Sequence, residues 1–172
     1  SGRERFLDKT PAYALVLDFL VKLYPGARYI VLTRHPLAVW SSFVDSFFDG
    51  DGEAAHRQNP LLERYVPAIA RFLREKPVPL LHVRYETLVQ EPEAEMRRVC
   101  AFLDIDFVPA MIEYGGSEGE APGKVAAGLG DPITVGRETR PTTKSVAKWA
   151  AGMASDPTRL AQARQILDRL LD

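Results

Sequence analysis

Residues 29–42 read YIVLTRHPLAVWSS, and the order of residue types in this stretch decides the fold. Positions 29–33 are mainly apolar and rich in β-branched side chains, which is typical of a strand buried on both faces of a parallel sheet. Arg34 and His35 follow as a turn, and Pro36 stands where the first residue of a helix is favoured. Apolar residues then recur at helical spacing. The stretch therefore predicts a strand, a turn and an amphipathic helix.

The flanking sequence extends this pattern in both directions. A well-buried helix is expected over 12–24, because the segment is apolar on most of its surface and Pro25-Gly26 ends it. Further segments downstream carry the same two kinds of signal: helices over 61–74, from Pro92, over 146–153 and after the cap Asp156-Pro157, and a strand over 80–85. Strands that alternate with helices predict an α/β fold, in which helices flank a parallel sheet.

One segment, 115–141, departs from this pattern. It holds more than half of the glycines and few large apolar side chains, so we expect a long flexible loop within a single domain over 1–172.

Composition excludes several classes of partner. The chain has 172 residues and a net charge of −1, so it lacks the overall positive field that would hold nucleic acid or an anionic membrane. Any phosphate site must therefore be local. The single Cys100 fits a reducing compartment, and no signal peptide or membrane span is visible, so we expect a cytoplasmic protein. Nothing in the sequence indicates an oligomeric state. The three histidines show no metal-ligand spacing, and no metal is expected.

Arg34 is the first candidate site residue. Ligands of parallel sheets bind beyond the carboxyl ends of the strands, where the first turn of the next helix offers unpaired N–H groups. A guanidinium at this point suits phosphate oxygens. Ser42 lies opposite the apolar stripe of the helix, so its hydroxyl is free for a ligand. The alternative is that Arg34 pairs with a surface carboxylate and Ser42 is only solvated.

The segment RHPLAVWSS, 34–42, resembles the 3′-phosphate-binding segment of sulfotransferases that use 3′-phosphoadenosine 5′-phosphosulfate (PAPS). The resemblance implies that Arg34 and Ser42 bind the 3′-phosphate of the donor. FLDKTPAYA, 6–14, is similar to the Lys-Thr-Pro segment of that family and implies a catalytic role for Lys9. VRYETLVQEP, 83–92, resembles a stretch whose tyrosine lies near the adenine, which implies that role for Tyr85.

Three later segments resemble the same family. AFLDIDF, 101–107, and SVAKWAAGM, 145–153, follow in the expected order. GRETRPTTK, 136–144, is similar to a basic loop that closes over the 3′-phosphate, which makes Arg140 a candidate donor ligand. Solvated charge is the alternative interpretation of this loop. Glu86 is expected to pair with Arg84 or a helix terminus rather than to serve as a base.

The chain departs from the family at one element. Sulfotransferases of this type cradle the 5′-phosphosulfate in a P-loop-like turn before the Lys-Thr-Pro segment, and no G-x-x-x-x-G-K-[ST] occurs here. We therefore expect a P-loop-NTPase-like sheet that is incomplete at its N-terminus, in a fragment inactive by itself. The resemblance implies sulfuryl transfer from PAPS to a hydroxyl or amine of a small-molecule or glycan acceptor. The rival functions are a non-catalytic nucleotide- or partner-binding module and a nucleotide kinase or NTPase.

Overall fold

A computed structural model describes residues 5–113 and 139–171, with the side chains of 169–171 left out. Two strands and eight α-helices are assigned within these ranges, together with three short 3-10 helices. The elements are η1 (Pro11–Leu15), α1 (Leu17–Leu23), β1 (Tyr29–Thr33), α2 (Pro36–Phe47), α3 (Gly52–Gln58), α4 (Leu61–Glu75), β2 (Leu80–Arg84), α5 (Tyr85–Gln90), α6 (Pro92–Leu103), η2 (Pro109–Met111), η3 (Thr143–Ser145), α7 (Lys148–Ser155) and α8 (Pro157–Leu171). The predicted α/β class is therefore confirmed.

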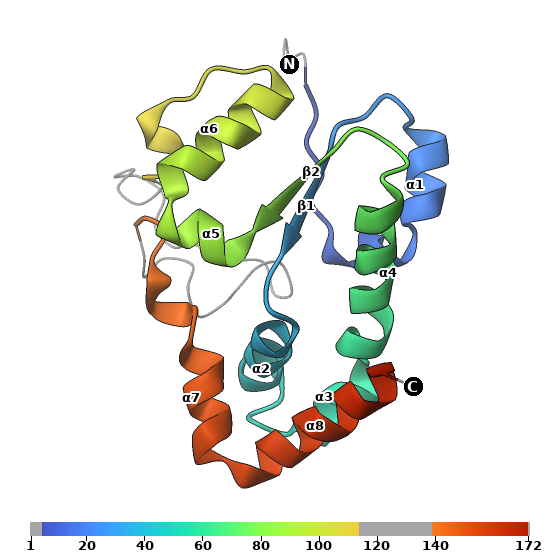
Figure 1. Cartoon of the computed structure of the whole chain (residues 1–172), viewed down its shortest axis with the longest axis vertical. Helices are drawn as coiled ribbons and strands as arrows, with labels where there is room; N and C mark the ends of the chain where they lie inside the picture. Colours follow the sequence, from blue (N-terminus) through green and yellow to red (C-terminus); the bar gives the residue numbers. More distant parts are fainter. Residues whose placement is uncertain (1–4, 114–138, 172) are drawn as a thin grey trace.

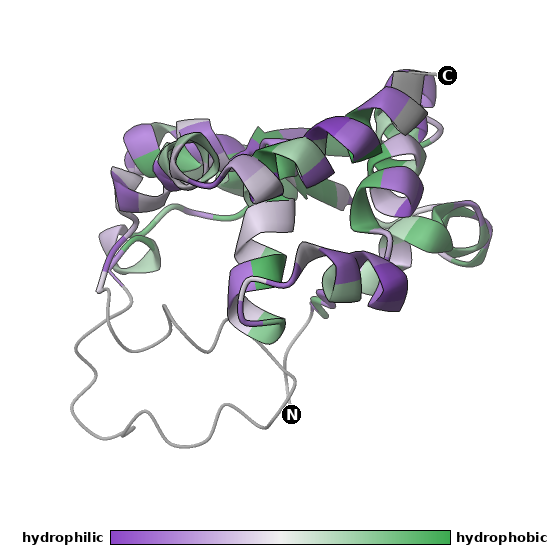
Figure 2. Cartoon of the chain, turned by 90° about the horizontal axis from the view of Figure 1, so that it is seen from below, coloured by the Kyte–Doolittle hydropathy of each residue, from purple (hydrophilic) through white to green (hydrophobic). Residues whose placement is uncertain are grey.

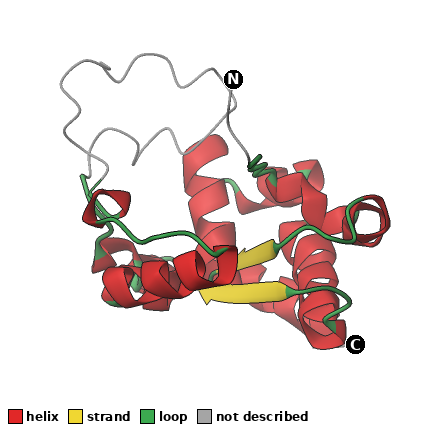
Figure 3. Cartoon of the chain, turned by 90° about the horizontal axis from the view of Figure 1, so that it is seen from above, coloured by secondary structure: helices red, strands yellow, loops and turns green. Residues whose placement is uncertain are grey.

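The sheet has two parallel strands, with Tyr29 opposite Leu80 and Thr33 opposite Arg84. Both strands therefore end at the same edge. In Figure 1 this edge points toward α2, while α5 and α6 lie on one side of the sheet and α1 and α4 on the other. Figure 3 shows the same two arrows pointing the same way, surrounded by helices.

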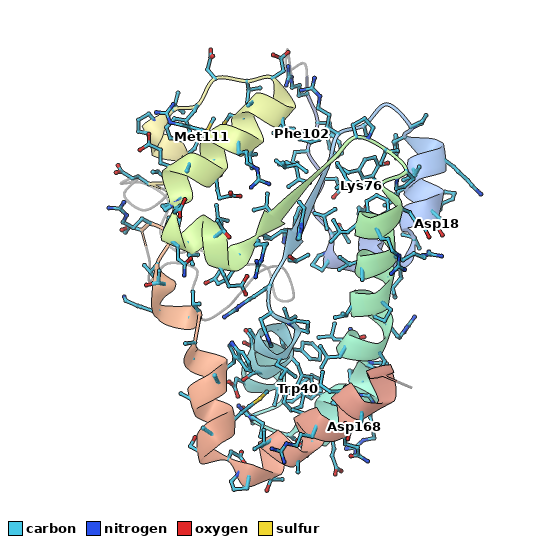
Figure 4. All side chains as sticks on the ribbon, viewed as in Figure 1. Asp18, Trp40, Lys76, Phe102, Met111 and Asp168 are labelled. Atoms are coloured by element: carbon cyan, nitrogen blue, oxygen red, sulfur yellow. The ribbon has the colours of Figure 1, made fainter. Side chains whose placement is uncertain are left out.

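The main core lies among helices rather than under the sheet. Its buried members come from α2, α3, α4, α7 and α8: Trp40, Val44, Ala55, Leu62, Met153, Ala163 and Ile166. Trp40, labelled in Figure 4, is only 2% exposed. The stripe predicted for α2 thus packs inward, although its member Phe47 is 58% exposed at the helix end. The core therefore fixes α2 beyond the carboxyl ends of the strands, where a ligand site is expected.

Two expectations about burial are wrong. The segment 12–24 is not one buried helix but η1 followed by α1, neither of which contains a buried residue. Figure 2 shows the apolar colour of α1 at the periphery of the molecule. The strand β1 is not buried on both faces either, since Leu32 is 56% exposed. An apolar pattern shows that a segment can be buried, but burial also requires another element to cover it.

Other boundaries differ by small amounts. β2 ends at Arg84, so the expected strand over 80–85 is one residue shorter and Tyr85 begins α5. Asp156 caps α8 as predicted, because its Oδ1 accepts bonds from the N–H groups of Thr158 and Arg159. The expected loop over 115–141 lies outside the described residues except for 139–141, which form neither helix nor strand.

Candidate functional site

Arg34 lies where β1 ends and α2 begins. Its backbone follows Thr33, the last residue of the strand, and precedes His35, the N-cap of a helix with Pro36 in its first turn. Because Thr33 pairs with Arg84, the residue after β2, Tyr85, lies beside Arg34. The guanidinium carbon of Arg34 is 4.5 Å from the centroid of the Tyr85 ring. This cation–π contact joins two of the residues selected from the sequence.

A third segment contacts Arg34 from the C-terminal part of the chain. The Nη2 atom of Arg34 donates a 2.6 Å hydrogen bond to the backbone carbonyl of Ser145, at the end of η3. The Nε atom is buried and has no hydrogen-bond partner among the described residues. The guanidinium is therefore oriented by an aromatic ring and a carbonyl, and it retains a donor that these contacts do not use.

His35 stacks on Trp149 of α7. The two ring centroids are 4.2 Å apart and the planes meet at 16°. This contact is not among the features that the sequence predicts. No local signal could reveal it, because the partner lies far along the chain. The stack and the Arg34–Ser145 bond together hold the C-terminal helices against the β1–α2 turn.

Glu86 belongs to α5, and its side chain reaches the start of α2. Its Oε1 accepts a 2.8 Å hydrogen bond from the backbone N–H of His35, which confirms the expectation that Glu86 pairs with a helix terminus. Glu86 therefore takes the N–H of His35 at the start of α2, and Pro36 has no N–H to offer a ligand. Partial burial raises the pKa of Glu86. This effect is outweighed by two backbone hydrogen bonds, from the N–H groups of His35 and Glu86, and by the positive charges of Arg84 and Arg34. The pKa of Glu86 therefore lies below its usual 4.5. Glu86 is therefore ionised at neutral pH.

The other predicted site residues are not brought together with Arg34. Ser42 is exposed on α2, Lys9 is exposed just before η1, and Arg140 is exposed before η3. Within residues 5–113 and 139–171, no hydrogen bond, ion pair or ring contact joins any of the three to Arg34. The structure therefore assembles Arg34 and Tyr85 from the predicted set, and it adds Ser145, His35 and Trp149.

The described residues offer neither a metal site nor a membrane span. No group of three or more histidines, cysteines, aspartates or glutamates there could hold a metal ion. None of the helices in those ranges is long and apolar enough to cross a membrane.

Several known proteins are similar to this chain in sequence and in architecture. A sequence model described as "Sulfotransferase family" matches residues 1–109. The chain is 34% identical over 143 residues to the nodulation protein NoeE of Sinorhizobium fredii (strain NBRC 101917 / NGR234), covering 69% of this chain and 32% of that protein. It is 27% identical over 113 residues to a putative protein-tyrosine sulfotransferase of Caenorhabditis briggsae, covering 64% of this chain and 40% of that protein.

Solved structures give the same result. A sulfotransferase domain from the curacin biosynthetic pathway aligns with a TM-score of 0.67 at 25% identity, covering 95% of this chain and 61% of that one. A sulfotransferase domain from the Synechococcus PCC 7002 olefin synthase aligns with a TM-score of 0.63 at 26% identity, covering 93% and 57%. The chain thus spans less than two thirds of the length of each of these relatives. The match over residues 1–109 shows that the chain belongs to the sulfotransferase family.

Proposed function

We propose that the protein transfers a sulfuryl group from PAPS to a hydroxyl or amine of a small-molecule or glycan acceptor. In this proposal Arg34 and Ser42 bind the 3′-phosphate of the donor, and Arg140 adds positive charge beside it. Tyr85 borders the adenine. Lys9 supplies positive charge to the transferring group.

The observation that carries the proposal is the state of Arg34. Its guanidinium is held by the Tyr85 ring at 4.5 Å and by the carbonyl of Ser145, while Nε is buried and has no partner among the described residues. A buried donor without a partner is costly, so a bound anion at this position would relieve the cost. A phosphate is the natural partner, because it accepts charge-assisted bonds from the guanidinium fork.

The chemistry that follows parallels phosphoryl transfer. The acceptor oxygen or nitrogen bonds to sulfur while the bond from sulfur to the bridging phosphate oxygen breaks, and adenosine 3′,5′-bisphosphate leaves. Positioning and charge neutralisation do most of this work. An ammonium such as that of Lys9 stabilises negative charge as it develops in the transition state. Arg34 and Ser42 act on the 3′-phosphate and thereby select PAPS over nucleotides that lack it.

The test is an assay of the full-length protein with PAPS labelled in its sulfuryl group and a panel of hydroxyl and amine acceptors. Transfer of label to an acceptor, with release of adenosine 3′,5′-bisphosphate, is the expected result. Tight nucleotide binding without transfer to any acceptor would indicate a non-catalytic module instead. Turnover of ATP without transfer from PAPS would indicate a kinase or NTPase.

A further inference from the structure

The helix that follows Arg34 is held from outside the candidate site by Arg159 of α8. The Nη2 atom of Arg159 lies 2.6 Å from Oδ1 of Asp45, and Nη1 lies 3.5 Å from Oγ of Ser41. Asp45 and Ser41 are one helical turn apart on α2, so a single guanidinium spans one turn of that helix.

The arginine side of this contact is shielded from water, whereas the aspartate side is exposed. The side chain of Arg159 is 13% exposed and that of Asp45 is 41% exposed. Ser41 is 3% exposed, and the Nε of Arg159 is buried and has no hydrogen-bond partner among the described residues. Loss of Asp45 would leave the shielded guanidinium of Arg159 without its ion-pair partner, which is unfavourable. Asp156 fixes the backbone at the same point, because its carboxylate accepts the N–H of Arg159.

The turn after α2 packs directly against α8. A Cβ added at Gly52 would lie 2.3 Å from Oε1 of Gln162 and 2.8 Å from Cζ2 of Trp40. Gly50 has a φ of +89°, and a Cβ there would lie 3.5 Å from Nη2 of Arg159. α8 and the turn after α2 are therefore in direct contact.

We propose that Arg159 is a positioning residue for the donor site, an inference that rests on the proposed function. Ser41 faces Arg159, whereas its neighbour Ser42 is exposed and is the proposed phosphate ligand. Arg34 is held separately, by Tyr85 and Ser145. Arg159 thus holds the helix that carries Ser42, the second proposed ligand of the phosphate. Its loss lets α2 shift and moves Ser42 out of reach of a phosphate that Arg34 still holds.

The experiment measures binding of adenosine 3′,5′-bisphosphate and AMP by calorimetry in Arg159→Met and in Arg164→Met. Arg164 is an exposed arginine of the same helix and serves as the matched control. Arg159→Met should lower the affinity for adenosine 3′,5′-bisphosphate about tenfold, which corresponds to the loss of one hydrogen bond to a charged group. AMP affinity should be unchanged, because AMP has no 3′-phosphate. Arg159→Lys should recover part of the loss, and Arg164→Met should match the wild type.

The Ser42→Ala background separates positioning from a general loss of structure. Because Arg159 acts through Ser42, adding Arg159→Met to Ser42→Ala should change bisphosphate affinity little. An undiminished effect in that background, or equal weakening of both nucleotides, overturns the inference. A wild-type protein that does not prefer the bisphosphate overturns the proposed function itself. Asp45→Asn removes the same ion pair with a smaller change in shape, and it should give the same selective loss if Arg159→Met does not fold.

Discussion

The carboxylate of Glu86 accepts the backbone N–H of His35 at 2.8 Å and thereby joins the first turn of α5 to the start of α2. This bond ties together the two turns that carry Tyr85 and Arg34. A negative charge at the N-terminus of a helix is favourable, because the unpaired N–H groups there carry partial positive charge. Glu86 therefore stabilises the start of α2 and also places a negative charge close to Arg34, the proposed ligand of the 3′-phosphate.

This geometry predicts how stability depends on pH. The pKa of Glu86 in the folded protein lies below the usual 4.5, so its stabilising effect is fully present above about that value. The effect is lost as the pH falls through the lowered pKa. Glu86→Gln keeps an oxygen that can accept the N–H of His35 but removes the negative charge, so it should destabilise the fold at pH 7 by about 0.3–1 kcal/mol. The difference from wild type should vanish in acid.

Urea unfolding at neutral and acidic pH measures this difference. Glu75→Gln, at an exposed glutamate, provides the control and should show no such change. A Glu86→Gln variant as stable as wild type at neutral pH would show that the negative charge of Glu86 at the start of α2 contributes nothing.

Arg34→Ala should lower the affinity for adenosine 3′,5′-bisphosphate far more than the affinity for AMP. Losing a charge-assisted bidentate contact should cost on the order of 2–3 kcal/mol. Calorimetry with both nucleotides measures the selectivity, and Arg74→Ala, which changes an exposed arginine, is the control. Equal weakening of the two nucleotides by Arg34→Ala would reject the assignment of Arg34 to the 3′-phosphate.

Lys9→Ala should lower turnover strongly and change donor affinity little. Lys9 is exposed and makes no hydrogen bond or ion pair within the described ranges, so its removal should not disturb the fold. A group that acts only in the transition state lowers kcat and kcat/KM together. Steady-state kinetics with a fixed acceptor separates the two effects. Normal turnover with poor donor binding would make Lys9 a binding residue.

The elements with strong local signals could be predicted from the sequence. β1 and the start of α2 agree with the structure residue by residue, because the apolar β-branched run and Pro36 act through neighbouring backbone geometry. The short helix α3 is not among the elements predicted from the sequence. Its signal was present: Asp51 accepts the N–H of Ala54 as an N-cap.

The parts of the site that depend on distant contacts could not be predicted. Arg34 and Tyr85 were selected separately, and only the register of the two strands places them together. The Ser145 carbonyl is a backbone group, which no side-chain pattern identifies. The prediction that β1 is buried is wrong for a related reason. Leu32 is apolar, but no described element covers it fully.

The stack of His35 on Trp149 leads to the last prediction. It links the turn that follows Arg34 to α7, and the segment just before α7 supplies the carbonyl of Ser145 that orients the guanidinium. An aromatic pair of this geometry stabilises a fold by about 0.5–1.5 kcal/mol beyond the area that it buries. Trp149→Leu keeps much of the apolar volume but removes the stack. It should therefore lower stability and also weaken the hold on Arg34.

A double-mutant cycle isolates the stack from the general packing of Trp149. His35→Ala and Trp149→Leu are made singly and together, and unfolding free energy and bisphosphate affinity are measured for each. Because the two rings act as one contact, the double variant should be less destabilised than the sum of the single variants, by about 1 kcal/mol. Phe43→Leu, at an aromatic residue on the far half of α2, should be additive with Trp149→Leu. Additivity between His35 and Trp149 as well would show that their stacking contributes no energy. In that case the Ser145 carbonyl would have to reach Arg34 without help from this contact.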